Sequence, residues 1–360
     1  MAKIRVLIVD DAVVIRRLLT DLLADDSALE VAGAAANGHI ALAKLDHVNP
    51  DVVILDVEMP DMDGLQTLAA LRQRRPLLPV IMFSALTERG AESTLEALAL
   101  GATDYITKPS NLGSMALAKQ RIGQELIPRI KALCRLAGGT SSAPPRARAP
   151  TRALARPSPW NGPVDVVCIA VSTGGPNALA DLLPALPADF PVPLVVVQHM
   201  PPLFTKFLAD RLNSRSRIRV EEASGGARLE PGVAWLAPGG WHMALERSGG
   251  TVVVRTHQGP QENSCRPAAD VLFRSVVSAY GGRVLAVVLT GMGQDGLRGC
   301  ELVREAGGQV IVQDEATSVV WGMPGYVAQA GLADRILPLD QIAGEITRRA
   351  TRSPSGRIPS

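Results

Sequence analysis

Two stretches of this 360-residue chain alternate short apolar runs with longer amphipathic segments. In the first stretch the short runs are typical of buried strands, and they cover residues 4–9, 51–55, 80–83 and 105–107. Between the runs, apolar residues recur at helical spacing, as in Ile15, Leu18, Leu19, Leu22 and Leu23. Strands that alternate with helices predict a parallel sheet covered on both faces.

The second stretch has the same pattern. Its strand-like runs cover residues 164–171, 194–197, 284–289 and 310–312, and residues 176–186 are helix-like with Pro176 in the first turn. We therefore predict two doubly wound α/β domains. Their predicted bounds are 1–125 and 163–347, with a linker at 126–162 and a flexible tail at 348–360.

The segment from Ala137 to Pro163 separates the two stretches. It is rich in Gly, Ser, Ala, Pro and Arg and has no apolar periodicity, so we predict a flexible linker. Its arginines, and those of the tail from Arg348, are interpreted as solvated. Binding of an acidic partner is the alternative.

Composition narrows the class of protein. Hydrophobic residues make up 47% of the chain and the net charge is +2, which gives no basis for binding nucleic acid. No apolar run is long enough to span a membrane, and no signal peptide is recognised, so a cytoplasmic monomer is expected. The four cysteines are far apart and form no CxxC, which indicates reduced thiols and neither disulfides nor a zinc site.

Polar side chains follow the strands of the first stretch. Asp10 and Asp11 follow its first strand, Asp56 the second, Ser84 ends the third, and Lys108 follows the fourth. Carboxyl ends of parallel strands share one edge, so these groups should converge. Clustered carboxylates need a cation, and Mg²⁺ suits carboxylates with phosphate oxygens. Asp56 could then attack a phosphoryl group; helix capping and a loop start are the alternative interpretation.

These residues resemble the receiver domains of two-component systems, over about residues 1–125. The motifs are Val9-Asp10-Asp11, the run Leu55-Asp56-Val57-Glu58-Met59-Pro60, Gly64, Ser84-Ala85 and Lys108-Pro109. The resemblance implies a flavodoxin-like fold with Asp56 as phosphoacceptor. It also implies Mg²⁺ bound by Asp10, Asp11, Asp56 and the backbone carbonyl of Glu58. Ser84 and Lys108 are implied as phosphate contacts, and Tyr105 as the aromatic switch residue.

A serine, a histidine and an aspartate follow three strands of the second stretch. They are Ser172, His199 and Asp295. A base can activate a serine hydroxyl, and a carboxylate can orient the base, so the three could form a hydrolytic triad. Gly174 and Gly175 would allow a tight turn after the serine. Ala170 departs from G-x-S-x-G, and a helix cap, a core histidine and a turn residue are the alternatives.

The second stretch resembles the catalytic domain of the chemotaxis protein-glutamate methylesterases (CheB), over about residues 163–347. The matching motifs are Ser172-Thr173-Gly174-Gly175, Gln198-His199-Met200, Arg266-Pro267, Leu289-Thr290-Gly291-Met292-Gly293 with Asp295-Gly296, and Gly322-Met323-Pro324. The resemblance implies a Rossmann-like domain in which Ser172 is nucleophile, His199 base and Asp295 acid. Thr173 and Met292 match the oxyanion region. Cys265 replaces the family's usual histidine, and we expect it to affect only substrate contact.

The combined resemblance implies a phosphorylation-controlled serine hydrolase of chemotaxis. Its substrates would be glutamate methyl esters on methyl-accepting chemoreceptors, with release of methanol, and receptor glutamines that are deamidated. A chemotaxis histidine kinase would be the phosphodonor. Mg²⁺ would belong to the receiver, and the esterase site would need no metal. In the family the resting receiver covers the catalytic face, and phosphorylation relieves the block.

Rival interpretations remain open at this stage. Gly291, Gly293 and Gly296 spell G-x-G-x-x-G, and with Asp314 they are formally a dinucleotide fingerprint. A receiver joined to a nucleotide-dependent enzyme is therefore one rival class, and an adaptor with a vestigial hydrolase site is another.

Other histidines and a thiol are candidate bases or nucleophiles. His242 and His257 are interpreted as surface or packing residues, and His39 and His47 as solvated. Cys265 is interpreted as an ordinary half-buried thiol.

Overall fold

A computed structural model of the chain describes residues 2–108, 115–137, 162 and 164–351. The chain divides into two compact units, Met1–Pro144 and Pro145–Ser360. Residues 138–161 of the predicted linker, the tail from residue 352 and Pro109 lie outside the described residues.

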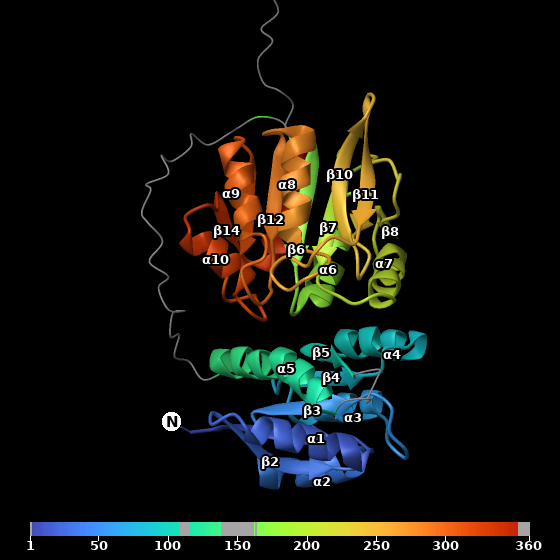
Figure 1. The fold of residues 1–360 in the computed structure, drawn as a ribbon, viewed down its shortest axis with the longest axis vertical. Coiled ribbons are helices and arrows are strands. Elements are labelled where there is room, and N and C mark those ends of the chain that lie inside the picture. Colours follow the sequence, from blue (N-terminus) through green and yellow to red (C-terminus); the bar gives the residue numbers. More distant parts are fainter. Residues whose placement is uncertain (1, 109–114, 138–161, 163, 352–360) are drawn as a thin grey trace, which may run out of the picture. The chain divides into compact units, whose positions relative to one another are not determined.

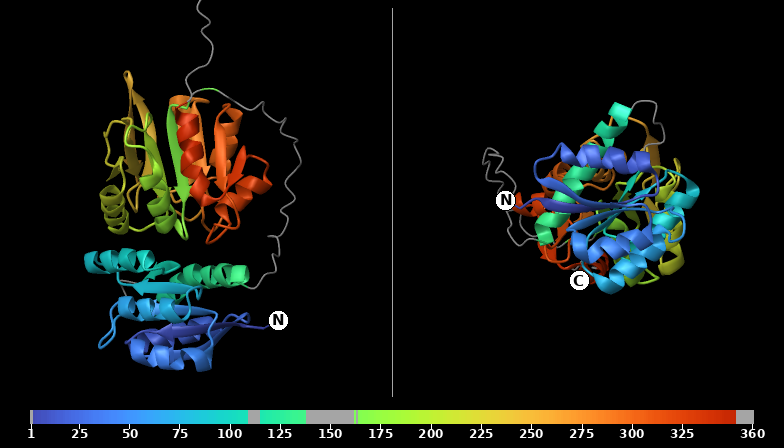
Figure 2. Two further views of the ribbon diagram at one scale, coloured as in Figure 1. Left: turned by 180° about the vertical axis from the view of Figure 1, so that it is seen from behind. Right: turned by 90° about the horizontal axis from the view of Figure 1, so that it is seen from below.

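The first unit is a parallel sheet between two helical layers. Its strands are β1 (Ile4–Val9), β2 (Leu29–Ala35), β3 (Val52–Asp56), β4 (Val80–Ser84) and β5 (Asp104–Thr107), in the order β2-β1-β3-β4-β5. Its helices are α1 (Val13–Ala24), α2 (Gly38–Val48), α3 (Gly64–Arg74), α4 (Glu88–Ala99) and α5 (Met115–Ala137). Helices α1 and α5 cover one face and α2, α3 and α4 the other (Figures 1 and 2). The strand order is that of flavodoxin-like proteins, as predicted.

Helix α1 shows how the apolar pattern forms this unit. The five residues predicted to share a face are the buried residues of α1. Helix α5 continues past the predicted domain end at residue 125, because Leu126, Ile130 and Leu133 are buried at helical spacing. Residues 126–137 are therefore helical, in place of the predicted linker. Strand β2 was not predicted, because Gly33 and neighbouring alanines interrupt its apolar run.

The second unit contains a seven-stranded parallel sheet and a hairpin. The sheet order is β14-β13-β12-β6-β7-β9-β8. Its strands are β6 (Val166–Val171), β7 (Leu194–Gln198), β8 (Arg219–Glu222), β9 (Val233–Leu236), β12 (Val284–Val288), β13 (Gln309–Gln313) and β14 (Arg335–Leu337). The antiparallel hairpin is β10 (His242–Ser248) with β11 (Thr251–His257). The predicted strands are confirmed, whereas β8, β9, β14 and the hairpin were not predicted.

Helices cover both faces of the larger sheet. They are α6 (Gly175–Leu182), continued by the 3₁₀ turn η1 (Leu183–Ala185), α7 (Phe204–Arg215), α8 (Ala269–Tyr280), α9 (Leu297–Glu305), α10 (Met323–Gln329) and α11 (Leu339–Ala350). Helices α8, α9 and the hairpin lie on one face, and α6, α7 and α11 on the other (Figures 1 and 2). Two doubly wound α/β domains are thus confirmed.

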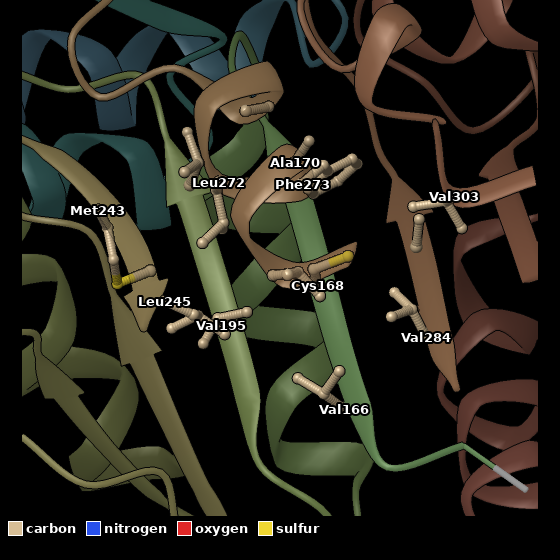
Figure 3. Packing of buried hydrophobic residues seen from close by; sticks show 14 of the residues in the cluster. Val166, Cys168, Ala170, Val195, Met243, Leu245, Leu272, Phe273, Val284 and Val303 are labelled. Atoms are coloured by element: carbon tan, nitrogen blue, oxygen red, sulfur yellow. The ribbon is translucent and has the colours of Figure 1, made fainter. Parts of the chain in front are cut away.

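A continuous apolar core holds α8 against the strands that carry the site. Leu272 and Phe273 of α8 are fully buried over Cys168 and Ala170 of β6 (Figure 3). A Cβ at Gly299 of α9 would lie 2.5 Å from Phe273 Cβ, so glycine allows α9 to approach α8 closely. Full burial of a Phe side chain stabilises a fold by about 1.5–3 kcal/mol. The amino ends of α8 and α9 are therefore fixed relative to β6.

The arginine at position 349 is not solvated, in contrast to the expectation for the tail from Arg348. Arg349 belongs to α11 and is 6% exposed, with ion pairs to Glu345 and Asp334 and a hydrogen bond to Gln309. The tail predicted from residue 348 thus begins inside a packed helix, because these partners hold the guanidinium. Among the helices of the described residues, none has the length and apolar character needed to cross a bilayer.

Candidate active and phosphorylation sites

Three carboxylates meet at the carboxyl edge of the smaller sheet. Asp10, Asp11 and Asp56 each offer an oxygen, and these oxygens all lie within 4.8 Å of one another. Lys108 Nζ lies 2.9 Å from Asp10 Oδ2 and 2.8 Å from Asp56 Oδ2. Burial raises the pKa of Asp56 to about 6, although the hydrogen bond from Lys108 opposes this shift. Two buried carboxylates that share one cation, with the exposed Asp11 beside them, form the donor set that a divalent metal requires.

The remaining predicted receiver residues lie on β4 and β5 and just after β3. Ser84 is fully buried at the end of β4, and its hydroxyl donates to the carbonyl of Gly90. Tyr105 is buried on β5, and its carbonyl accepts from Arg129. The backbone N–H of Glu58 donates to Asp56 Oδ1, while its side chain pairs with Arg89 on the surface. The Glu58 carboxylate thus points away from the cluster and leaves only its backbone near Asp56.

Ser172 and His199 follow neighbouring strands of the larger sheet. Strands β6 and β7 pair in parallel with Val171 opposite Gln198, so the next residues on each strand are Ser172 and His199. Parallel neighbours lie about 4.8 Å apart. The Gln198 side-chain amide fixes both ends, because its Nε2 donates to the carbonyls of Ser172 (3.0 Å) and His199 (3.3 Å). Sequence reasoning gave Gln198 no role.

The imidazole of His199 is held by Asp295. Nε2 lies 2.8 Å from Asp295 Oδ2, and both side chains are largely buried. Because a carboxylate only accepts, Nε2 carries the proton in this pair and Nδ1 is left for proton transfer. Burial alone would lower the pKa of His199, but the Asp295 hydrogen bond and a contact with Cys265 outweigh burial and raise that pKa to about 10.

Asp295 is held by four further N–H donors. Oδ2 also accepts from the backbone of Ala269 (2.6 Å), and Oδ1 accepts from Asn263 Nδ2 (2.8 Å) and the backbones of Asp270 and Gly296 (both 3.1 Å). Burial would raise the pKa of Asp295, but the hydrogen bond with His199 and the backbone donors lower it. The carboxylate therefore stays ionised and fixed in direction.

Glycines bring the backbone close to Ser172. Gly174 has φ +77°, in the left-handed region that favours glycine, and it turns the chain into α6. A Cβ at Gly291 would lie 2.8 Å from Ser172 Cβ. Within the described part of the chain, the backbone N–H groups of Thr173 and Met292 donate no hydrogen bond. Two N–H donors are thus uncommitted on the segments that flank Ser172, as an oxyanion site requires.

The described contacts of the His199 ring are with Asp295 and Cys265, and the hydroxyl of Ser172 is not among them. Nucleophile–base hydrogen bonds are often long in free enzymes and tighten when substrate binds. The register of β6 and β7 leaves Ser172 beside His199 at the strand ends, so the three side chains occupy one edge of the sheet.

The position of Cys265 differs from the expectation. We expected Cys265 to affect substrate contact only, but its Sγ lies 3.6 Å from His199 Nδ1. The thiol therefore contacts the ring nitrogen that remains for proton transfer. Sequence distance concealed this contact, because the segment from 262 to 265 reaches the triad from beyond the hairpin.

The rival candidates have other partners. His242 is fully buried, with Nε2 donating to the carbonyl of Pro260 and Nδ1 accepting from Ala268. Of the surface or packing role that was predicted, the structure shows packing. His257 lies beside it on β11, with ring centroids 5.2 Å apart. Asp314 accepts from the backbone and hydroxyl of Thr317 and so caps a turn.

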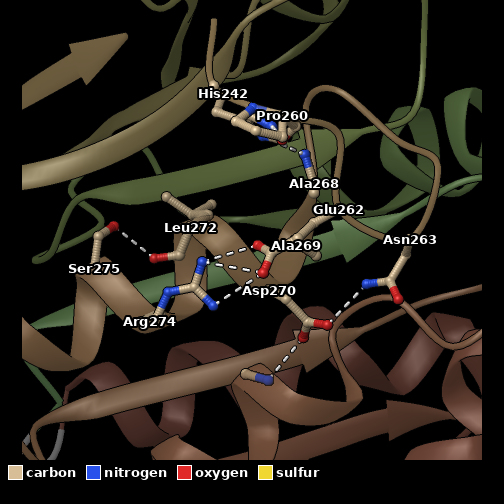
Figure 4. A network of polar contacts seen from close by, with 12 residues as sticks. His242, Pro260, Glu262, Asn263, Ala268, Ala269, Asp270, Leu272, Arg274 and Ser275 are labelled. Atoms are coloured by element: carbon tan, nitrogen blue, oxygen red, sulfur yellow. Dashed lines mark hydrogen bonds and ion pairs between the residues drawn. The ribbon is translucent and has the colours of Figure 1, made fainter. Parts of the chain in front are cut away.

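Two residues around Asp295 were missed by sequence reasoning. Asn263 and Asp270 contact each other (Figure 4), and both donate to Asp295. Asp270 is 3% exposed. A lone carboxylate inside the apolar run 267–273 was a usable signal for Asp270. Nothing in the sequence around Asn263 pointed to it.

Comparison with known proteins covers both units. Residues 167–346 match the family described as CheB methylesterase, and residues 6–119 match the response regulator receiver domain. The chain is 54% identical to the protein-glutamate methylesterase/protein-glutamine glutaminase of Trichodesmium erythraeum, over 97% of this chain and 99% of that protein. It is 48% identical to the protein of the same name from a Nocardioides species, over 100% and 99%. The Thermotoga maritima CheB methylesterase catalytic domain is 42% identical and covers 52% of this chain and 99% of its own length, with a TM-score of 0.51.

Proposed function

The chain belongs to the CheB methylesterase family, and on that premise we propose that Ser172, His199 and Asp295 are its catalytic residues. The protein is a phosphorylation-controlled chemotaxis methylesterase and glutaminase. It hydrolyses glutamate methyl esters and deamidates glutamines. The observation that carries the catalytic assignment is the 2.8 Å contact between His199 and Asp295 beside the strand end that bears Ser172.

Acyl transfer would begin at the Ser172 hydroxyl. His199 Nδ1 takes the hydroxyl proton as the oxygen attacks the ester carbonyl, and Asp295 stabilises the imidazolium through Nε2–H. The backbone N–H groups of Thr173 and Met292 would stabilise the developing oxyanion. His199 then returns the proton to the departing ester oxygen, which leaves as methanol, or to the departing amide nitrogen of a glutamine, which leaves as ammonia. Water, activated by the same nitrogen, cleaves the acyl-enzyme.

The first unit would supply control through Asp56. Asp10, Asp11 and Asp56, with the backbone carbonyl of Glu58, would hold Mg²⁺, which neutralises charge during phosphoryl transfer. Asp56 would attack the phosphoryl group, and Lys108 and Ser84 would contact the transferred oxygens. Tyr105 would respond as the switch residue. Phosphorylation adds about −1.5 to −2 of charge, enough to rearrange these partners.

The proposal extends to partners and location. The substrates would be methyl-accepting chemoreceptors, and the phosphodonor a chemotaxis histidine kinase. A monomer in the cytoplasm fits these partners, and the four cysteines are free thiols.

Release of methanol from methylated receptor membranes tests this function. The parent chain is expected to release methanol faster when a small-molecule phosphodonor and Mg²⁺ are added. In Asp56→Ala the ratio of the rates with and without phosphodonor is expected to fall to about 1, because the acceptor is gone. Asp21→Ala, on the exposed side of α1, is the matched control. A normal response in Asp56→Ala would place the phosphorylation elsewhere.

The contact of Cys265 with His199 gives a pH prediction. Only neutral His199 can act as base, so kcat/KM is expected to rise with pH through a limb above the usual histidine pKa of about 6.5. Cys265→Ala removes a contact that raises the His199 pKa, so the limb should move to lower pH. Cys134→Ala, in the first unit, should leave it unchanged. A limb that stays in place in Cys265→Ala would contradict the assigned contact.

A further inference from the structure

A single side-chain nitrogen joins the catalytic acid to a second buried carboxylate. Asn263 Nδ2 lies 2.9 Å from Asp270 Oδ2 (Figure 4). The same nitrogen lies 2.8 Å from Asp295 Oδ1. Both partners are carboxylate oxygens, which only accept, so the amide must present its two N–H groups to them. Asn263 thus gives one hydrogen to each carboxylate.

Burial of the Asp270 carboxylate costs folding free energy unless hydrogen bonds offset it. It is 3% exposed in the first turn of α8, and burial together with the nearby charge of Asp295 raises its pKa. Its Oδ1 accepts from the backbone of Gly299, so it also ties α8 to α9. Two buried like charges repel each other strongly unless donors separate them. Asn263 is the side-chain donor common to both.

Asn263 lies in a hydrogen-bonded turn. Glu262 and Cys265 exchange backbone hydrogen bonds, and the two residues between them, Asn263 and Ser264, have φ of 52° and 61°. Two consecutive positive φ values are those of a type I′ turn, which favours asparagine and glycine. Turn preference explains the residue type but does not explain why the amide reaches two carboxylates. The same turn delivers Cys265 to the opposite nitrogen of His199.

We propose that Asn263 is a positioning residue for hydrolysis, which separates Asp270 from Asp295 and keeps the Asp295 carboxylate ionised and aimed at His199. This inference rests on the proposed function of Ser172, His199 and Asp295. It assigns Asn263 no contact with substrate. Asp270 is the partner of Asn263 in this role, because it links the Asn263 amide to the amino ends of α8 and α9.

Two variants distinguish the contribution of the Asn263 amide group from the contribution of the turn conformation. Asn263→Gly introduces a residue that tolerates positive φ, and it removes both N–H groups of the side chain. We therefore expect kcat to fall by roughly 10- to 100-fold, with a smaller change in KM. Asn263→Asp keeps the shape and adds a third carboxylate, so it should be slower still. Ser264→Gly, at the adjacent turn position, should keep the parent rate. Circular dichroism and thermal unfolding report whether each variant is folded.

The pH dependence of Asn263→Asp adds a readout that a packing role would not move. A protonated carboxyl group at position 263 has one O–H to donate and an ionised one has none, so the variant's deficit against the parent should deepen as pH rises. The charged groups that face this side chain are Asp270 and Asp295, with His199 beyond Asp295 and the Glu262–Arg274 ion pair at the turn. A deficit that is constant with pH would overturn the proposal.

A double-mutant cycle with Asp270→Asn tests the pairing itself. Asp270→Asn alone sets two amide N–H groups against each other, and Asn263→Gly alone sets two carboxylates against each other. The double variant removes both conflicts. Its kcat relative to the parent should therefore exceed the product of the relative kcat values of the two single variants by about 10-fold or more.

The assay uses the full chain and methylated receptor membranes, with Ser172→Ala beside the variants. Simple multiplication of the single losses, or an Asn263→Asp variant at the parent rate, would overturn the positioning role. If Ser172→Ala releases methanol at the parent rate, the proposed function is overturned instead. The two failures are thus distinguishable.

Discussion

Ser172→Ala is expected to lower methanol release by roughly 10⁴-fold or more, with binding of the receptor membranes retained. The substitution removes the only oxygen of residue 172 that can form the acyl-enzyme. The backbone around it stays in place, because Ser172 N–H donates to the Thr290 carbonyl and its own carbonyl accepts from Gln198 and Gly175. Loss of activity would therefore report lost chemistry.

The control for this prediction is Ser214→Ala, an exposed serine of α7 whose hydroxyl donates to the Arg211 carbonyl of the same helix. It should keep the parent rate. Mass spectrometry of the parent after rapid mixing with substrate should detect an acyl group on Ser172 and none in Ser172→Ala. Methanol release at the parent rate from Ser172→Ala would remove the proposed mechanism.

The strand ends were predictable because parallel sheets obey a simple rule. Residues in continuous apolar runs become buried strands, and the polar residues that follow each run lie at or beyond the carboxyl edge. That rule located Asp10, Asp56, Ser172 and His199. It also located Asp295, which lies beyond β12 in the loop before α9.

The turn residues around the triad were not predictable by the same rule. Asn263 and Cys265 reach His199 and Asp295 only because the β10–β11 hairpin and the following segment fold back over α8. The hairpin itself had a usable signal in Gly249-Gly250, a two-residue turn between strand-like segments. Strand β8 had none, because its polar sequence pairs on one side only, at the edge of the sheet.

Asp295→Asn is expected to lower kcat by about 10⁴-fold, because no orientation of an amide fits the five donors around residue 295. If the NH₂ group faces His199, it opposes the Ala269 N–H and reverses the imidazole tautomer, so Nδ1 carries the proton and cannot act as base. If it faces the other way, it opposes the N–H groups of Asn263, Asp270 and Gly296. Either conflict also leaves buried donors unpaired, at about 1–3 kcal/mol of folding stability.

Both orientations of the amide leave the enzyme impaired. With the tautomer reversed, raising the pH does not restore Nδ1 as base, so the variant should stay slow across the range in which the parent becomes active. Urea unfolding measures the accompanying stability loss. Asp210→Asn, an exposed carboxylate on α7, is the control and should match the parent in rate and stability. Recovery of Asp295→Asn to the parent rate at high pH would show that Asp295 only adjusts the His199 pKa, and that the proton on Nε2 is fixed by another group.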